Sequence, residues 1–347
     1  MKNKVILVGA INEGNVPTCG ETMKNQLFIK RFKELFDKVI TVDTLNWKHR
    51  PWILIRLLFV LLFNRGAKVI ISASGSATYL IKFLYYIPLK KRVYFWVVGG
   101  DIAKGVSNGL YDIKTLKKLK YILVQGKSMV DDLAKFGIHN VLHVPNSKPI
   151  TYTPNIMPKE DGEKYRFVFL SRIHPDKGIN EIVDATEELN KKGLQDRFEV
   201  DFYGKIEPSY KEKFEEMLTH HSNTHYQGFL NLTNNNGYET LAQYDVMLFP
   251  TYWCGEGFPG IVIDANISGL PIIASDWNMN REVIQDGKTG FIIPVHDSQT
   301  LAKYMERFIC NDIELYTIRK YCAEHIKQYD YRKVITKDLL TQIGLLE

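Results

Sequence analysis

Cysteine is scarce in this sequence. The 347 residues contain four cysteines, at positions 19, 254, 310 and 322, and no two of them form a C-x-x-C pair. Neither a disulfide framework nor a cysteine zinc site is therefore predicted, and the usage fits the reduced thiols of a cytoplasmic protein. The histidines show no metal spacing either, since His220 and His221 are adjacent and would point apart on a helix. We expect no metal and no bound cofactor.

The sequence also lacks a segment with the length and composition of a membrane span. Trp52–Phe63 is almost wholly apolar, but it has only 12 residues and contains Arg56, whereas a span needs about 20 apolar residues. Two interpretations of this stretch remain open: a helix packed on its own sheet, or a helix lying in a membrane interface. The apolar run Val5–Ala10 is too short for a secretory signal, and we expect it to be a buried strand.

Several signatures of other protein classes are missing. The first strand leads into AINEGNVPTCG, which lacks the close G-x-G-x-x-G of dinucleotide-binding oxidoreductases. No basic segment interleaved with aromatic residues forms a recognisable nucleic-acid-binding module. No repeat with a period of 20 to 50 residues is visible, which argues against a solenoid.

Charge is distributed unevenly along the chain. Residues 1–160 carry 25 Lys and Arg against 10 Asp and Glu, whereas residues 161–347 carry 20 against 29. The two parts therefore have net charges of +15 and −9, which sum to the overall +6. The basic part indicates a negatively charged partner, such as a phospholipid surface or a lipid-linked diphosphate, and a merely solvated surface is the alternative.

Short apolar runs alternate with longer mixed segments along the whole chain. This pattern is typical of buried parallel strands separated by helices. The length suits two domains, and the irregular segment 148–164, with its three prolines, predicts the boundary. We therefore expect an α/β protein of two doubly wound domains, residues 1–155 and 156–317, followed by a helical segment over 318–347.

The turn after the predicted strand Phe167–Leu170 carries two cations. Its sequence, SRIHPDKGINEIVDA, places Arg172 and Lys177 five residues apart. Open α/β sheets bind ligands at the carboxyl ends of their strands, and a helix beginning near Gly178 adds its positive end. Such a pair suits a diphosphate, although two ordinary surface cations would give the same pattern.

A Gly/Pro-rich loop in the second half carries two carboxylates. Residues 249–275, FPTYWCGEGFPGIVIDANISGLPIIAS, predict a strand, a loop, a helix starting near Pro259 and a further strand. Glu256 lies in the loop, and Asp264 lies about one turn inside the helix. Free N–H groups at the helix start can hold phosphate or hydroxyl oxygens, so this segment predicts a site for a polyhydroxylated ligand.

These two segments resemble the motifs of the family 4 retaining glycosyltransferases of the GT-B fold, within the glycosyl transferases group 1. SRIHPDKG resembles the family's Arg and Lys pair, EGFPGIVID resembles its E-x7-E motif, and the following GLPIIASDWNMNREVIQDGKTGFIIP and Asp297 also fit. The resemblance covers nearly the whole chain. It implies two facing Rossmann-like domains with a cleft between them, an acceptor-binding first domain, a nucleotide-sugar-binding second domain and a C-terminal segment that packs back toward the first.

The resemblance implies roles for the matching residues. Arg172 and Lys177 would grip the donor diphosphate, Glu256 would hold the transferred sugar, and Asp264 would hold the ribose hydroxyls. Arg172, Lys177 and Glu256 are the expected catalytic residues. The full set expected to bind the donor is Gly20, Arg172, Lys177, Glu256, Gly257, Phe258, Pro259, Gly260, Ile261 and Asp264.

Three positions depart from the family pattern. Asp264 stands where glutamate is usual, and its shorter side chain makes the ribose contact indirect or altered. Cys19 replaces a glycine, which leaves Gly20 either as a neighbour of the diphosphate or acceptor or as an ordinary helix-entry glycine. Gly100 replaces a histidine, and Asp101 after it either meets the donor or acceptor or caps the next helix.

The implied activity is transfer of a sugar from a UDP- or GDP-linked donor to a hydroxyl of a glycan or lipid-linked acceptor, with retention of the configuration at the anomeric carbon. The implied setting is surface polysaccharide or glycoconjugate synthesis. The base of the donor nucleotide is expected to lie near Tyr203–Lys205 and Gly228–Leu230. The expected location is the cytoplasm, with peripheral contact to an anionic membrane left open. Two alternatives remain: a membrane-associated scaffold that keeps this fold without its chemistry and, less favoured, a Rossmann oxidoreductase.

Overall fold

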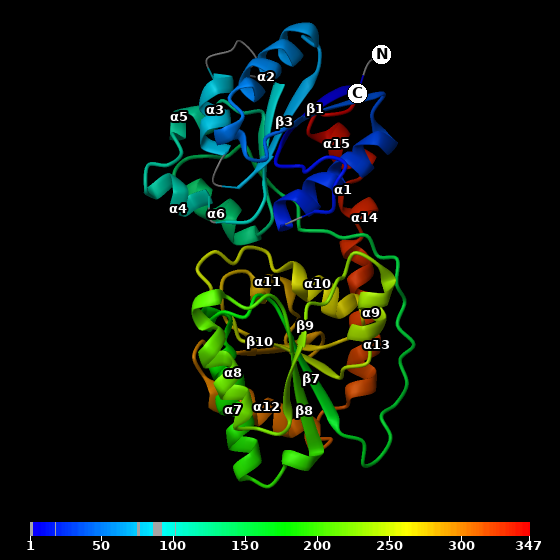
Figure 1. Ribbon diagram of the computed structural model, residues 1–347. Helices are drawn as coiled ribbons and strands as arrows, with labels where there is room; N and C mark the ends of the chain where they lie inside the picture. The colour runs from blue at the N-terminus through cyan, green and yellow to red at the C-terminus, as the bar shows by residue number, and fades with distance from the viewer. Residues whose placement is uncertain (1–2, 18, 75–76, 86–91, 101) are drawn as a thin grey trace. The chain divides into compact units, whose positions relative to one another are not determined.

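The computed structural model describes residues 3–17, 19–74, 77–85, 92–100 and 102–347. The chain forms two compact units, Met1–Pro149 with Tyr329–Glu347, and Ile150–Gln328 (Figure 1). The chain thus passes between units a few residues before the expected position 155. The segment expected over 318–347 is divided, because its residues before Tyr329 belong to the second unit.

The first unit is built on a parallel six-stranded sheet in the order β2-β1-β3-β4-β5-β6. Its strands are β1 Lys4–Gly9, β2 Lys38–Asp43, β3 Lys68–Ala73, β4 Val93–Val97, β5 Tyr121–Val124 and β6 Val141–His143. Its helices are α1 Gly20–Leu35, α2 Trp52–Phe63, α3 Ala77–Tyr85, α4 Ile102–Ser107, α5 Ile113–Leu116, α6 Lys127–Lys135, α14 Tyr331–Val334 and α15 Lys337–Gln342. Near-continuous Val, Ile and Leu runs form these strands because both faces of the sheet are covered.

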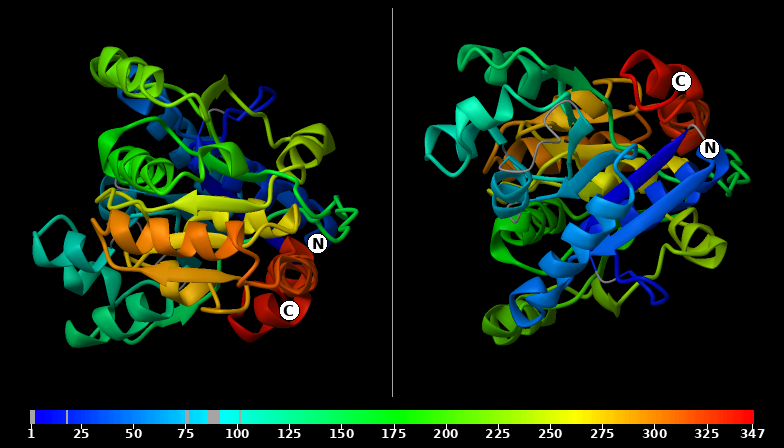
Figure 2. Two further views of the ribbon diagram at one scale, coloured as in Figure 1. Left: turned by 90° about the horizontal axis from the view of Figure 1, so that it is seen from below. Right: turned by 90° about the horizontal axis from the view of Figure 1, so that it is seen from above.

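One face of the first sheet is covered by helices from both ends of the chain. The side chains of α1 and of the C-terminal segment share one core with the strands, including Phe28, Phe32, Trp96, Leu340 and Ile343. The C-terminal helices, red in Figure 1 and Figure 2, accordingly lie beside the blue α1. Helices α2 and α3 lie on the opposite side of the sheet in Figure 1.

The second unit repeats the architecture with strand order β12-β11-β10-β7-β8-β9, again with parallel pairing throughout. Its strands are β7 Tyr165–Leu170, β8 Phe198–Tyr203, β9 Thr224–Gly228, β10 Val246–Phe249, β11 Ile272–Ser275 and β12 Gly290–Ile293. Its helices are α7 Ile179–Lys191, α8 Lys211–Thr219, α9 Asn235–Leu241, α10 Gly260–Ile267, α11 Asn280–Val283, α12 Ser298–Ile309 and α13 Leu315–His325. Helices α7, α8 and α12 pack on one face of this sheet, and α9, α10 and α13 lie on the other (Figure 1).

The two units confirm the α/β fold class that the alternating pattern predicted. None of the helices among the described residues is long and apolar enough to cross a bilayer.

Candidate functional site

The second sheet reverses its winding between β7 and β10. From β7 the strand order runs one way through β8 and β9, and it runs the other way through β10, β11 and β12. The connections leave neighbouring strands in opposite directions at such a point, which opens a crevice outside their carboxyl ends. The two segments singled out by their sequence follow these two strands, so the fold brings them together.

The two cations follow β7 but differ in their exposure. Arg172 lies exposed in the bend after the strand, whereas Lys177 is buried at the end of a single 3-10 turn, Pro175–Lys177. Gly178 is the N-cap of α7 with a φ of +82°, and a Cβ atom there would lie 2.3 Å from the Pro250 carbonyl oxygen. Glycine is therefore required where the turn after β7 touches the segment after β10.

Glu256 joins the two segments. Its Oε2 accepts a hydrogen bond from Lys177 Nζ in an ion pair, and it also accepts one from Thr251 Oγ1 at 3.3 Å. The Lys177 and Glu256 side chains are only 10% and 15% exposed, so solvent screens this pair weakly. Next to the pair, the Tyr252 N–H donates to the Asp176 carbonyl oxygen at 2.8 Å. The expected catalytic trio thus has two members in direct contact and Arg172 nearby in the chain.

Helix α10 begins at Gly260, and Pro259 is its N-cap in an extended conformation. Gly257 and Phe258 precede it, Ile261 is its second residue, and Phe258 is buried. The first N–H groups of a helix have no acceptor within the helix and lie at the positive end of its dipole. The segment from Glu256 to Ile261 therefore places a carboxylate close in the chain to the start of α10.

Asp264 is buried inside α10, where its Oδ1 accepts a hydrogen bond from the Tyr238 hydroxyl at 2.9 Å. Burial and the neighbouring Asp264 charge raise the pKa of Tyr238, so its proton stays in place. Tyr238 in turn stacks on Tyr152 with the ring centroids 6.1 Å apart. The shorter carboxylate is thus held by a tyrosine of α9, a partner that the sequence pattern did not reveal.

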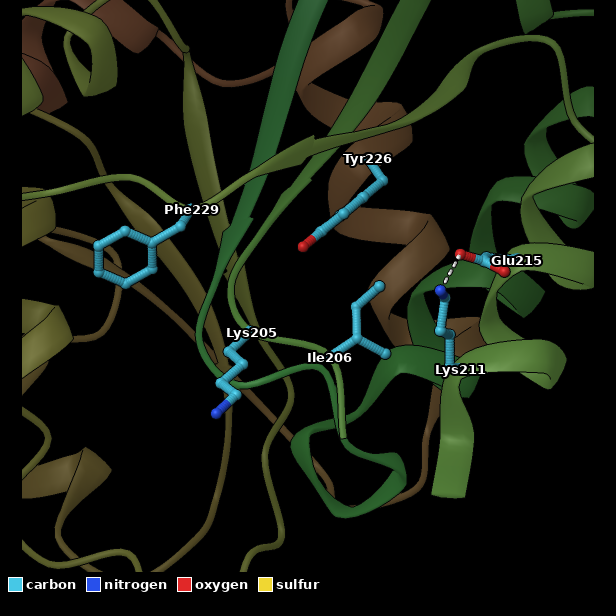
Figure 3. A pocket seen from close by; sticks show the side chains of 6 residues that line it. All are labelled: Lys205, Ile206, Lys211, Glu215, Tyr226 and Phe229. Atoms are coloured by element: carbon cyan, nitrogen blue, oxygen red, sulfur yellow. Dashed lines mark ion pairs between the residues drawn. The ribbon is translucent and has the colours of Figure 1, made fainter. Parts of the chain in front are cut away.

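A pocket of about 550 Å³ lies at the ends of β8 and β9 (Figure 3). Its lining is Lys205, Ile206, Lys211, Glu215, Tyr226 and Phe229. The Tyr226 hydroxyl donates to the Gly204 carbonyl oxygen at 2.9 Å, while the Phe229 side chain is 77% exposed. The Ile173 N–H donates to the Lys205 carbonyl oxygen at 3.0 Å, which places the pocket beside the segment that carries Arg172.

Trp253 was not predicted as a site residue. Its ring centroid lies 5.7 Å from both the Arg172 guanidinium carbon and Lys177 Nζ, and its ring meets His174 edge-on at 4.9 Å. The electron-rich indole ring attracts cations, so Trp253 contributes to holding each of the two side chains. Its position three residues before Glu256 was visible in the sequence, but its contacts with the turn after β7 are a property of the fold.

The remaining predicted positions lie elsewhere. Gly20 is the first residue of α1 in the first unit, where Cys19 is the N-cap. Asp101 lies outside the described residues. Asp297 caps α12 by accepting from the Thr300 N–H at 2.8 Å. A hydrogen bond from the Thr300 hydroxyl and, to a smaller extent, this backbone bond lower the pKa of Asp297. Within the described part of the chain, no three His, Cys, Asp or Glu side chains converge as a metal site requires.

The chain is similar to known proteins in sequence and in fold. Residues 156–328 fit the family model described as glycosyl transferases group 1. The chain is 24% identical over 230 residues to the poly(ribitol-phosphate) alpha-N-acetylglucosaminyltransferase of Staphylococcus aureus (strain COL), which covers 65% of this chain and 44% of that protein. The chain spans less than half the length of the curated relatives that it matches.

Two solved structures resemble the chain over nearly its whole length. The lipopolysaccharide outer core galactosyltransferase WaaB has a TM-score of 0.72 at 13% identity, covering 99% of this chain and 100% of that one. Anabaena HepE in complex with UDP has a TM-score of 0.67 at 13% identity, covering 98% and 99%. At these identities the likeness shows the fold. The motifs, the matched family model and the two parallel sheets together show that the chain belongs to the glycosyl transferases group 1 and has the GT-B fold.

Proposed function

We propose that the chain is a retaining glycosyltransferase of family 4, which transfers a sugar from a nucleotide diphosphate-sugar to a hydroxyl of a glycan or lipid-linked acceptor. The observation that carries the proposal is the Lys177–Glu256 pair at the switch point of the second sheet, with Arg172 and the start of α10 beside it. A diphosphate needs cations, and a sugar needs a carboxylate and N–H groups. This crevice offers the cations, the carboxylate and the N–H groups within one unit.

The donor fits along the ends of four strands. The base of the nucleotide would occupy the pocket at β8 and β9, against Tyr226 and Phe229, since an exposed aromatic ring offers a stacking surface. The diphosphate would then reach Arg172 and Lys177, and the sugar would reach Glu256. HepE, which shares the fold, has been crystallised with UDP and with UDP-glucose, in keeping with a uridine nucleotide as donor.

The proposed mechanism is a front-face substitution. The acceptor hydroxyl attacks the anomeric carbon on the side from which the diphosphate leaves, so that a strong protein base is not required. Arg172 and Lys177 stabilise the negative charge that grows on the leaving diphosphate, a role that a metal ion has in other enzymes. The proton of the acceptor hydroxyl passes to the departing phosphate oxygen.

The proposed setting is the synthesis of a surface polysaccharide or glycoconjugate at the cytoplasmic side of a membrane. The relatives' names support it, since they include a capsular polysaccharide biosynthesis glycosyltransferase. A scaffold without catalysis is the second candidate, because Asp264 and Gly100 depart from the family pattern. Sugar transfer from the donor to added acceptors distinguishes the two.

The first prediction concerns nucleotide binding and turnover. Thermal shifts with UDP, GDP, ADP and their sugar conjugates should identify one nucleotide that stabilises the chain by about 2.7 kcal/mol at 100 times its dissociation constant. With that donor, Lys177→Ala should lower turnover by roughly 100-fold or more. Arg172→Ala tests the same role at an exposed residue, so it avoids disturbing a buried pair.

Lys288→Ala is the matched control, because Lys288 is an exposed lysine of the same unit that lies outside the crevice. Circular dichroism melts should show that the variants remain folded. Near-normal turnover of both crevice variants, or stabilisation only by a dinucleotide, would contradict the proposal.

A further inference from the structure

The outward face of α2 is apolar. Its exposed side chains are Trp52, Ile55, Leu58, Phe59, Leu62 and Phe63, together called the α2 face below. They recur at spacings of three and four residues and so lie on one side of the helix, while Ile53, Leu57 and Leu61 form the buried side. A helix on the surface of a soluble domain normally turns charged residues outward. This one instead leaves Phe63 81% and Trp52 59% exposed.

The apolar surface continues beyond the helix. The rings of Phe59 and Phe63 stack with their centroids 6.3 Å apart. Trp47, just before α2, contacts Tyr79 of α3 with the ring centroids 5.6 Å apart, and Tyr79 is 61% exposed. Aromatic residues with one polar end are typical of surfaces at the boundary between lipid and water.

The sequence around α2 is rich in basic residues and has no acidic residue. Residues 44–100 contain no Asp or Glu, but their basic residues are Lys48, Arg50, Arg56, Arg65, Lys68, Lys82, Lys90, Lys91 and Arg92. Arg50 and Arg65 are exposed on either side of α2. Arg56 is exposed within the helix, and its guanidinium donates to the Thr41 carbonyl oxygen at 3.4 Å, which ties it to the neighbouring strand β2.

A second copy of the chain is a poor partner for this surface. Two copies meeting through α2 would bring their arginines together without any acidic residue in the segment to offset them, and such like-charge contacts are costly. A helix of 12 residues is also only about 18 Å long, so α2 alone would contribute much less than the roughly 800 Å² that each partner contributes to a stable interface. An anionic lipid surface satisfies both the apolar side chains and the cations.

We propose that the α2 face is a membrane-docking surface that lies in the interface of an anionic bilayer, with its apolar side chains among the acyl chains and Arg50 and Arg65 on lipid phosphates. A helix of this length cannot span the bilayer, so it binds parallel to the surface. The inference does not depend on the proposed sugar transfer, because binding to vesicles is measured without a donor or acceptor.

The test uses the full chain with vesicles of phosphatidylcholine alone or with 30% phosphatidylglycerol, in a flotation assay over a range of salt concentrations. Binding to the anionic vesicles should be at least tenfold stronger than to neutral ones, and it should weaken as salt rises. Ile55→Asn with Phe59→Asn should lower binding at least tenfold. Met157→Gln, at an exposed apolar residue of the second unit, should change it less than twofold.

The contribution of the arginine charges to vesicle binding is tested in the same assay. Arg50→Glu with Arg65→Glu should lower binding to the anionic vesicles at least tenfold and remove most of its salt dependence, whereas Lys288→Glu should have no effect. Brominated lipids should quench tryptophan emission in the unaltered chain. Trp52→Phe should keep vesicle binding but lose most of that quenching.

Three results would overturn the proposal. One is binding that is equal on neutral and anionic vesicles. Another is binding that Ile55→Asn with Phe59→Asn leaves intact. The third is a dimer by light scattering that the same double variant converts to monomer, with no vesicle binding, since that would assign the face to a second copy. Ile55 and Phe59 are exposed, so the double variant should remain folded, and a thermal melt checks this.

Discussion

Lys24 is a buried lysine in α1 that the proposed mechanism does not use. Its Nζ donates to Asn146 Oδ1 at 3.0 Å and to Ser147 Oγ at 3.2 Å, and both acceptors are neutral. Burial, with a smaller effect of the Lys148 charge, lowers the pKa of Lys24 from 10.5 to about 7. The folded chain therefore releases this proton more easily than the unfolded chain does.

This residue predicts a pH-dependent stability. Between pH 7 and about 10 the unfolded state retains the Lys24 proton while the folded state loses it, so the free energy of unfolding should rise with pH by up to about 1.4 kcal/mol per unit. Lys24→Met should remove this rise. Urea unfolding at pH 7, 8 and 9 measures it, and Lys33→Met, at an exposed position of the same helix, should keep the wild-type slope. Parallel pH profiles for the wild type and Lys24→Met would disprove the effect.

The turn between β7 and α7 is the element that positions the two cations. It depends on a left-handed glycine at its end and on the close approach of that glycine to Pro250. The loop after β10 is tied to the same turn by the Tyr252 to Asp176 backbone bond. A substitution at Gly178 therefore disturbs both loops, because the new Cβ atom lies between them.

A substitution at Gly178 costs free energy through backbone strain and through the contact of the new Cβ atom with Pro250. A comparison with Gly193, just after α7, distinguishes these two costs. Gly193 has a φ of +78°, similar to that of Gly178, but a Cβ atom there would meet nothing within 4 Å. Gly193→Ala should cost about 1 kcal/mol from the backbone alone, whereas Gly178→Ala should cost at least about 3 kcal/mol and weaken nucleotide binding. Urea unfolding and nucleotide titration measure the two effects. Equal losses would show that the contact with Pro250 is unimportant.

The last residues of the chain complete the first unit, although they follow the whole second unit in sequence. Ile335, Leu340, Ile343, Leu345 and Leu346 are buried in the core formed with α1 and the first sheet. The Tyr94 hydroxyl also donates to the Ile343 carbonyl oxygen at 3.0 Å. Each unit nevertheless has its own core, so the two should respond separately to damage.

Deletion of residues 329–347 tests this organisation. Burial of five large aliphatic side chains stabilises by about 10 kcal/mol in total, which is comparable with the whole stability of a domain. Hydrogen exchange should therefore show lost protection in β1, β3 and β4, while β7 and β10 keep theirs. Deletion of Glu347 alone is the control and should change neither unit. Equal loss of protection in both sheets would contradict separate cores.

The strands and the two family motifs could be predicted because their signals are local. The predicted strand Val5–Ala10 overlaps β1, and Phe167–Leu170 lies within β7, because buried parallel strands are continuous apolar runs. Strand β6, Val141–His143, has no such apolar run, because it is short and only half-buried. Tyr238 and Trp253 were missed because aromatic residues are common in cores, and only contacts between distant segments distinguish these two.

The sequence by itself determined the fold class and the family, since apolar periodicity and motif spacing are properties of the chain's order. It also determined the charge imbalance between the two parts. Only the tertiary structure decided that Lys177 pairs with Glu256, that Tyr238 holds Asp264 and that the apolar side of α2 faces outward. These outcomes depend on which strands become neighbours and which side of a helix meets the sheet, and such long-range packing is not written in any local stretch of residues.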